Sequence, residues 1–256
     1  MAFVPDSRTY APGATTDGAL IDAGLRSYML RVYNWMCSGL LLTGAVAYGI
    51  ANTSAADLFY HVMQSPYGPR PVPTGLGYVA MFAPLAFVLV LSAGVGRFSR
   101  TAVQGLFWAF AAAMGASLAN IFVIYTGSSI ARVFFISSAT FGAMSLYGYT
   151  TKADLSRMGS FLMMGLIGII VASVVNMFLG SSMLQFGISV IGVLIFVGLT
   201  AYDTQRIKAD YVQYAYAEGT DGAAVRSVFD ALSLYLNFIN IFMFLLQLFG
   251  NRNSNS

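Results

Sequence analysis

Charged side chains are scarce in this chain: they make up 9% of its 256 residues, against about 25% in an ordinary soluble domain. Hydrophobic residues make up 57%. This balance excludes an ordinary water-soluble domain and predicts a protein embedded in a lipid bilayer. The net charge is only +3 and the basic residues are scattered, with just two lysines, so we expect no nucleic-acid partner.

Cysteine and histidine each occur once, and both rarities exclude classes of chemistry. Cys37 cannot form an internal disulfide, and no Cys/His metal pattern exists, so it is interpreted as a small packing residue. His61 lies in a predicted loop with no nucleophile motif around it. The Gly-x-Gly-Asp context of an intramembrane aspartyl protease is also missing. We therefore expect no enzyme and no bound cofactor.

Long apolar runs are what the chain has instead, and a spanning helix needs about 20 mostly apolar residues. Seven runs qualify, which predicts an all-α fold: a polytopic membrane protein built as a seven-transmembrane-helix bundle over residues 31–250. Residues 1–30 are predicted to be a polar tail, with a helix at the membrane surface over Ile21–Arg31 as an open alternative for its last part, and residues 251–256 a short C-terminal tail. The expected spans are Val32–Ala51, Gly75–Val95, Ala102–Tyr125, Val133–Tyr149, Met158–Leu179, Met183–Tyr202 and Phe229–Phe249. Between the first two, the proline-rich stretch Asn52–Thr74 is expected to be a stiff connection.

Basic residues are concentrated in alternate connections. Ten of the thirteen lie on one predicted side, which the positive-inside rule places in the cytoplasm. The N-terminus is then expected inside and the C-terminus outside the cell membrane, the inner membrane in a bacterium. The ten are Arg8, Arg26, Arg31, Arg97, Arg100, Lys152, Arg157, Arg206, Lys208 and Arg226.

Asp203 directly follows the sixth apolar run. A carboxylate in or just under a bilayer is costly, so an acid at this position is a functional candidate. The alternative is a helix-end acid that is solvated by headgroup water and paired with Arg206 or Lys208. Protonation changes the hydrogen bonding of a carboxylate, which makes Asp203 a candidate pH-sensitive latch.

Polar residues recur at helical spacing within the seventh apolar run, so they form a stripe along one face of the predicted helix. Such a stripe should face the protein interior or water and not lipid. Asp230 is expected near the entrance of this helix, where a first-turn acid is also favourable to the helix dipole. Ser233 and Asn240, like Thr200 on the sixth helix, are candidate pore-lining residues, although interhelical hydrogen bonding would also explain Ser233 and Asn240. The stripe comprises Asp230, Ser233, Asn237, Asn240 and Gln247.

Two segments carry a family resemblance. TAYDTQRIK at residues 200–208 and ALSLYLNFINIF at residues 231–242 resemble the bacterial branch of the Bax inhibitor-1 family, the transmembrane Bax-inhibitor-motif proteins. The similarity covers the chain from about Arg26 to Gly250. It implies a pH-sensitive calcium leak in which an acid of helix 6 shares a proton with an acid of helix 7.

The resemblance places the helix 6 acid at Asp203 and the helix 7 acid at Asn237, which is a departure. An aspartate–asparagine pair can form a hydrogen bond but lacks the like-charge repulsion of two carboxylates. The sequence therefore leaves both alternatives, gating that depends on protonation and gating that does not. Asp230 lies on the same face but about 10 Å away along the axis, too far to replace the pair directly.

The resemblance further implies an arginine near the end of helix 2 that latches the closed pore. Arg97 and Arg100 are both candidates for this latch. Calcium prefers several oxygen ligands, and Asp203, Asn237 and Asn240 with backbone carbonyls would offer a weak, transient site for a permeant ion.

Two functions follow as hypotheses. The first is a calcium-permeable leak gated between helices 6 and 7. The second is an interaction protein, because some bacterial relatives are thought to restrain a membrane-bound AAA protease and eukaryotic ones are linked to protection from cell death. In that case the N-terminal tail and the segment 208–229 would be the contact surfaces.

Overall fold

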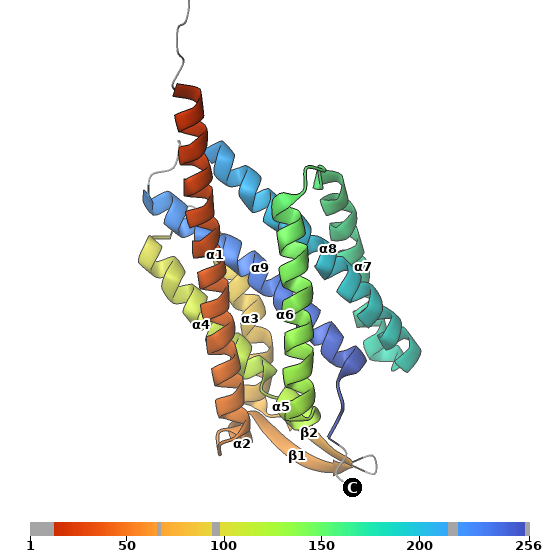
Figure 1. Ribbon diagram of the computed structural model, residues 1–256. Coiled ribbons are helices and arrows are strands. Elements are labelled where there is room, and N and C mark those ends of the chain that lie inside the picture. The colour runs from red at the N-terminus through yellow and green to blue at the C-terminus, as the bar shows by residue number, and fades with distance from the viewer. Residues whose placement is uncertain (1–12, 66–67, 94–97, 215–219, 254–256) are drawn as a thin grey trace, which may run out of the picture.

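The computed structural model describes residues 13–65, 68–93, 98–214 and 220–253. Long helices form one bundle, and α9 (Thr220–Phe249) runs through its middle (Figure 1). α9 packs against α1, α4, α6 and α8, and it is the most buried of the apolar helices. Its side chains Leu234, Tyr235, Ile241 and Leu246 are fully buried. The helix that carries the polar stripe is therefore also the core of the protein.

The other elements follow one another up and down this core. The remaining helices are α1 (Gly13–Ala51), α2 (Ala56–Phe59), α3 (Gly75–Ala93), α4 (Arg100–Leu118), α5 (Ile121–Ile124), α6 (Gly127–Thr150), α7 (Ser156–Leu179) and α8 (Ser182–Tyr214). Two strands, β1 (Tyr60–Ser65) and β2 (Gly68–Pro73), lie between α2 and α3. Gly180 separates α7 from α8 with a φ of 62°, a left-handed conformation that glycine adopts without strain and that ends α7.

Six helical segments are long and apolar enough to cross a membrane. They are Gly75–Ala93, Arg100–Ile124, Gly127–Thr150, Ser156–Leu179, Ser182–Gln213 and Gly222–Phe249. α1 is not among them, so the structure supports a helical multi-pass bundle with six such segments and leaves the predicted count of seven unconfirmed. The lipid-facing surface is plainest on α7, where Phe161 and Phe178 are 73% and 82% exposed. Large apolar side chains so exposed fit contact with lipid tails.

Helix boundaries correct three sequence-based predictions. Residues 13–30 are not a tail but the first half of the continuous helix α1, while residues 1–12 lie outside the described part of the chain. α8 continues for three turns beyond Tyr202, so Asp203 lies within a helix and not at its end. α9 begins at Thr220 and not near Phe229. In each case the polar flank continues the helix, which hydropathy alone does not register.

The proline-rich connection is also more ordered than expected, and it is the exception to the all-α prediction. β1 and β2 form a two-stranded antiparallel sheet in which Tyr60 pairs with Pro73 and Val62 with Pro71 (Figure 1). Pro69, Pro71 and Pro73 are two residues apart, so their backbone nitrogens all face the same edge of β2. A proline without an N–H is tolerated on an unpaired edge, and a two-stranded sheet provides one.

Close packing of α6 on α8 depends on Gly148. A Cβ at this position would overlap the backbone carbonyl of Ala201, two residues before Asp203. Gly142 lies on the same helix, and a Cβ there would meet open space. Gly148 therefore sets how near α6 approaches α8.

This contrast gives a stability prediction. Gly148→Ala is expected to lower the free energy of unfolding by about 1–3 kcal/mol, because the clash is with backbone and forces the helices apart. Gly142→Ala is the matched control and should be neutral or stabilising by up to about 1 kcal/mol, since alanine favours a helix. The measurement is the thermal unfolding midpoint of the purified protein in detergent. Equal midpoints for the two variants would contradict the assigned role of Gly148.

Candidate functional site

Asp203 lies on the face of α8 that meets α9, and both of its carboxylate oxygens have partners. Asn237 of α9 donates a hydrogen bond from Nδ2 to Oδ2 of Asp203 over 2.7 Å. Arg206, one turn further along α8, places Nη2 3.0 Å from the other oxygen, Oδ1. The side chain of Asp203 is 15% exposed and Asn237 is buried. The sequence suggested a contact between the sixth and seventh predicted spans, which correspond to α8 and α9. This contact is present, and Arg206 takes part in it as well.

The net charge of this site is close to zero, because the negative carboxylate of Asp203 is paired with the positive guanidinium of Arg206 and Asn237 is neutral. Of the two cations considered as partners for Asp203, Arg206 forms the ion pair. Lys208 instead donates to the backbone carbonyl of Tyr149 at 3.0 Å. Within the described ranges, Nε of Arg206 is buried without a hydrogen-bond partner. The ion pair between Nη2 and Asp203 therefore orients the guanidinium beside α9.

A cavity of about 890 Å³ opens beside these residues. Asp203, Arg206, Ser233, Asn237 and Asn240 form its polar side. We call it the Asp203 cavity. Its apolar walls are Met81, Pro84, Leu85 and Val88 of α3, Phe110 and Met114 of α4, Met163, Leu166 and Ile170 of α7, and Phe196, Leu199, Tyr202 and Leu236 of α8 and α9; Ser117 of α4 completes the lining.

The walls of the cavity differ in how firmly they are packed. α8 and α9 form the most extensive helix contact in the described chain, whereas α3 packs along α4 and has no comparable contact with α7, α8 or α9. α3 also contains Pro84, which lines the cavity and cannot donate a backbone hydrogen bond within the helix. α3 and α7 are accordingly the walls that each pack against a single long helix in the described chain, α4 and α8, and of the two only α3 is interrupted by a proline.

The segment around Asp203 ties α8 to three neighbours at once. Thr204 shares a hydrogen bond with Ser145 of α6, which in turn contacts the hydroxyl of Tyr33 of α1. Gln205 accepts from the N–H of Leu155 at 2.8 Å and donates to the carbonyl of Ala153 at 2.7 Å, so it fastens the α6–α7 connection. Since successive positions on a helix point in different directions, one short motif can serve all of these contacts.

The polar stripe of α9 divides among three environments. Ser233, Asn237 and Asn240 face the Asp203 cavity, as expected for pore-lining residues. The hydroxyl of Ser233 and the amide of Asn240 also contact backbone carbonyls one turn earlier, those of Phe229 and Leu236. Gln247, near the far end of the helix, bonds instead to Gln185 and Ser189 of α8.

Two predicted site residues lie elsewhere. Asp230 accepts a 2.6 Å hydrogen bond from the hydroxyl of Tyr28 on α1 and does not line the Asp203 cavity. It lies about three turns into α9, so the first-turn, helix-dipole interpretation was wrong. Thr200 is fully buried, its hydroxyl donates to the carbonyl of Phe196, and it does not line the Asp203 cavity.

The two latch candidates are not placed at Asp203 by the structure. Arg97 lies outside the described residues. Arg100 begins α4 and is exposed, and it lines a different hollow, shared with Arg31, and not the Asp203 cavity. The parts of the proposed partner-binding surfaces at 1–12 and 215–219 also fall outside the described residues.

Stable metal binding finds little support in this site. The described residues contain no group of three or more His, Cys, Asp and Glu side chains that could hold a metal ion. Asp203 alone supplies a charged oxygen, with the carbonyl oxygens of neighbouring amides as neutral ligands.

Comparison with known proteins agrees with this architecture. The chain matches the family described as inhibitor of apoptosis-promoting Bax1 over residues 25–254. It is 48% identical over 239 residues to an uncharacterized protein of Rickettsia prowazekii, covering 93% of this chain and 95% of the relative. It is 46% identical over 230 residues to the inner membrane protein YbhL of Escherichia coli K12, covering 90% and 94%. An uncharacterized membrane protein of Streptococcus pyogenes is 37% identical over 232 residues, covering 91% and 96%. With matches of this extent across its helices, the chain is a multi-pass membrane protein of the Bax inhibitor-1 family.

Proposed function

We propose that this protein is a calcium-permeable leak whose path passes Asp203 between α8 and α9. The observation that carries the proposal is the placement of one carboxylate, two amides and a serine on a single side of an 890 Å³ cavity. Oxygen ligands of this kind suit calcium, and their small number keeps the ion mobile. Apart from Arg206, Ser117 and the hydroxyl of Tyr202, the rest of the lining is apolar, so this polar side is where an ion would travel.

In the closed state, Arg206 holds the Asp203 carboxylate and takes the place of a bound cation. α3 is the movable wall, because α4 is the one long helix against which it packs extensively in the described chain, and because it contains Pro84. Displacement of α3 widens the cavity and admits water and calcium to the ion pair. The second half of α1, Val32–Ala51, is the seventh span, since it carries no charged residue and lies along α4 and α9.

The orientation proposed is an N-terminus in the cytoplasm and a C-terminus outside. The N-termini of α1, α4, α7 and α9 and the C-termini of α6 and α8 lie towards one end of the bundle (Figure 1). Described basic residues at these termini include Arg26, Arg100, Arg157 and Arg226. The positive-inside rule assigns this end to the cytoplasm.

The direct test is calcium entry into liposomes that contain the purified protein and a calcium-sensitive dye. Entry well above that of protein-free liposomes supports the proposal. Entry equal to the protein-free rate contradicts it and favours an interaction protein, for which the measurement is co-purification of a membrane protease.

Arg206→Gln provides a prediction on the closed state. Removal of the guanidinium leaves the Asp203 carboxylate without its cation, so we expect the initial rate of calcium entry to rise by about three- to tenfold, the effect of about 1 kcal/mol on the barrier. Arg157→Gln is the control, since it removes the same charge from an exposed site at the start of α7. A rate unchanged by Arg206→Gln shows that the ion pair does not restrain the leak.

A further inference from the structure

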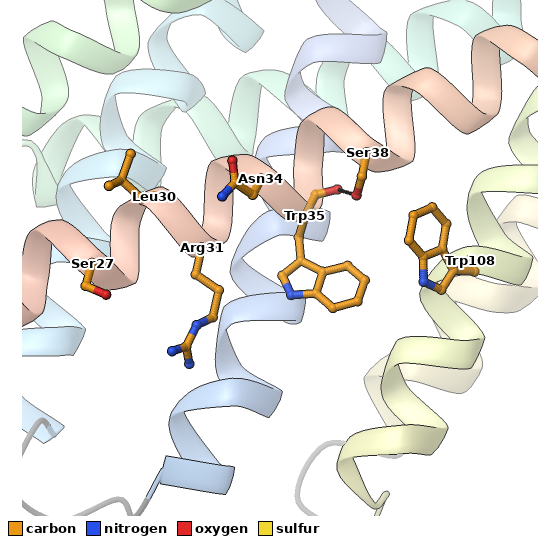
Figure 2. A pocket seen from close by; sticks show the side chains of 7 residues that line it. All are labelled: Ser27, Leu30, Arg31, Asn34, Trp35, Ser38 and Trp108. Carbon is orange, nitrogen blue, oxygen red and sulfur yellow. Dashed lines mark hydrogen bonds between the residues drawn. The ribbon is translucent and has the colours of Figure 1, made fainter.

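A second hollow lies on the outer side of the bundle, between α1 and α4, away from the Asp203 cavity. Its volume is about 540 Å³, and Arg31, Trp35 and Trp108 line it (Figure 2). Ser27, Asn34 and Ser38 of α1 add polar groups. We call it the α1–α4 groove. It shares no lining residue with the Asp203 cavity, and nothing in the proposed leak uses it.

Both tryptophans of the chain are in this groove. Their ring centroids are 5.8 Å apart, and one ring comes from each helix. Tryptophan gathers at the level of lipid headgroups, where an apolar ring with one N–H donor is favourable. Arg31 directly precedes the apolar run that begins at Val32, one turn before Trp35. The groove is therefore at the boundary between the headgroups and the hydrocarbon.

Arg31 supplies an uncompensated charge at this boundary. Its side chain projects from the same side of α1 as that of Trp35, which is drawn between Arg31 and Trp108 (Figure 2). Over the described stretches of the chain, the guanidinium has no ion-pair or hydrogen-bond partner. Among the residues that the structure describes, no acidic side chain lines the groove. Arg31 also lines the adjoining hollow that contains Arg100, so two arginines border this part of the surface.

We propose that the α1–α4 groove binds an anionic phospholipid. The fork of N–H donors on a guanidinium matches a phosphate, and basic pockets between membrane helices hold negative headgroups. Arg31 contacts the phosphate, Ser27 and Asn34 offer hydrogen bonds to the remainder of the headgroup, and the two indoles pack against the glycerol and the upper acyl chain. A zwitterionic lipid has the same chains but lacks the net charge, so it binds there less tightly.

The two tryptophans make this site directly observable. The protein is reconstituted in bilayers that contain dibrominated phosphatidylglycerol or dibrominated phosphatidylcholine at equal mole fraction, and quenching of tryptophan fluorescence is measured. Since both fluorophores are in the groove, the ratio of quenching gives the relative affinity of that groove for the two lipids. We expect a preference of about fivefold for phosphatidylglycerol, the size of effect of one basic residue near a lipid surface.

Arg31→Gln should reduce the preference to about one, whereas Arg31→Lys keeps the charge and should retain most of it. Arg26→Gln is the matched control, because it removes the same charge from an exposed position on the same helix outside the groove. Unchanged quenching by brominated phosphatidylcholine verifies that each variant is folded. Equal quenching by both lipids in the unaltered protein overturns the proposal, and so does an equal loss of preference in Arg31→Gln and Arg26→Gln.

Discussion

Calcium entry into liposomes is expected to fall at least tenfold when Asp203 is replaced by asparagine, a loss of about 1.4 kcal/mol or more in the stabilisation of the passing ion. The substitution keeps the shape of the side chain, and an amide oxygen can still accept from Asn237. What is lost is the only carboxylate of the Asp203 cavity. Arg206 then remains as an uncompensated cation beside the path, and it repels calcium.

The double variant Asp203→Asn/Arg206→Gln separates these two contributions. If the unpaired guanidinium is part of the block, the double variant should conduct faster than Asp203→Asn alone and slower than the unaltered protein. Asp57→Asn serves as the control, because Asp57 is an exposed acid on α2 that does not line the cavity. Equal entry through the unaltered protein and Asp203→Asn would remove Asp203 from the proposed path.

The second large effect is expected from Asn237→Asp, which restores the acid that the family resemblance implies at this position. The amide of Asn237 lies 2.7 Å from Oδ2 of Asp203, so the new carboxylate would be at hydrogen-bonding distance. Two carboxylates so close do not ionise independently, and a shared proton bridges them until the pH removes it. Gain or loss of that proton changes both the α8–α9 contact and the charge facing the cavity.

We expect the rates of calcium entry at pH 6 and pH 8 to differ by about tenfold in Asn237→Asp and by less than about twofold in the unaltered protein. A faster rate at pH 8 would mean that charge on the pair drives entry, and a faster rate at pH 6 that protonation opens the contact. Asn240→Asp is the control, since it adds an acid to the same cavity one turn further along α9. Identical pH profiles for the two variants, or a flat profile for Asn237→Asp, would contradict a carboxylate pair.

Apolar runs predicted most of the helices because the cost of exposing backbone to lipid imposes long, uncharged segments. They predicted boundaries poorly, since α1, α8 and α9 all continue through polar sequence. Those extensions are stabilised by contacts between distant residues, such as Tyr28 with Asp230, which no local pattern reveals. The hairpin was missed for a similar reason: whether a proline fits a strand depends on which edge is unpaired.

The candidate site was predictable where helical spacing decides the outcome. Asp203, Asn237 and Asn240 follow from one face of α8 and one face of α9. Thr200 and Asp230 lie on nearly the same faces but bond to Phe196 and Tyr28 instead. A small rotation of a packed helix is enough to turn residues at the border of a face towards a different neighbour. Arg206 had been considered only as a partner of a solvated acid, and the burial of its unpartnered Nε became visible only with the packing of α8 against its neighbours.

The length of α1 has one more consequence. At about 1.5 Å per residue, its 39 residues extend for about 58 Å, more than the 40–45 Å of a bilayer with its headgroups. A straight helix of this length either leans strongly or stands out in water, and Tyr28 fastens it to Asp230 of the core helix near the membrane boundary. The outer turns of α1 thus form a lever arm with its pivot at that hydrogen bond. A protein that binds the aqueous end and tilts it would move the rest of α1 against the bundle, without itself contacting the hydrocarbon.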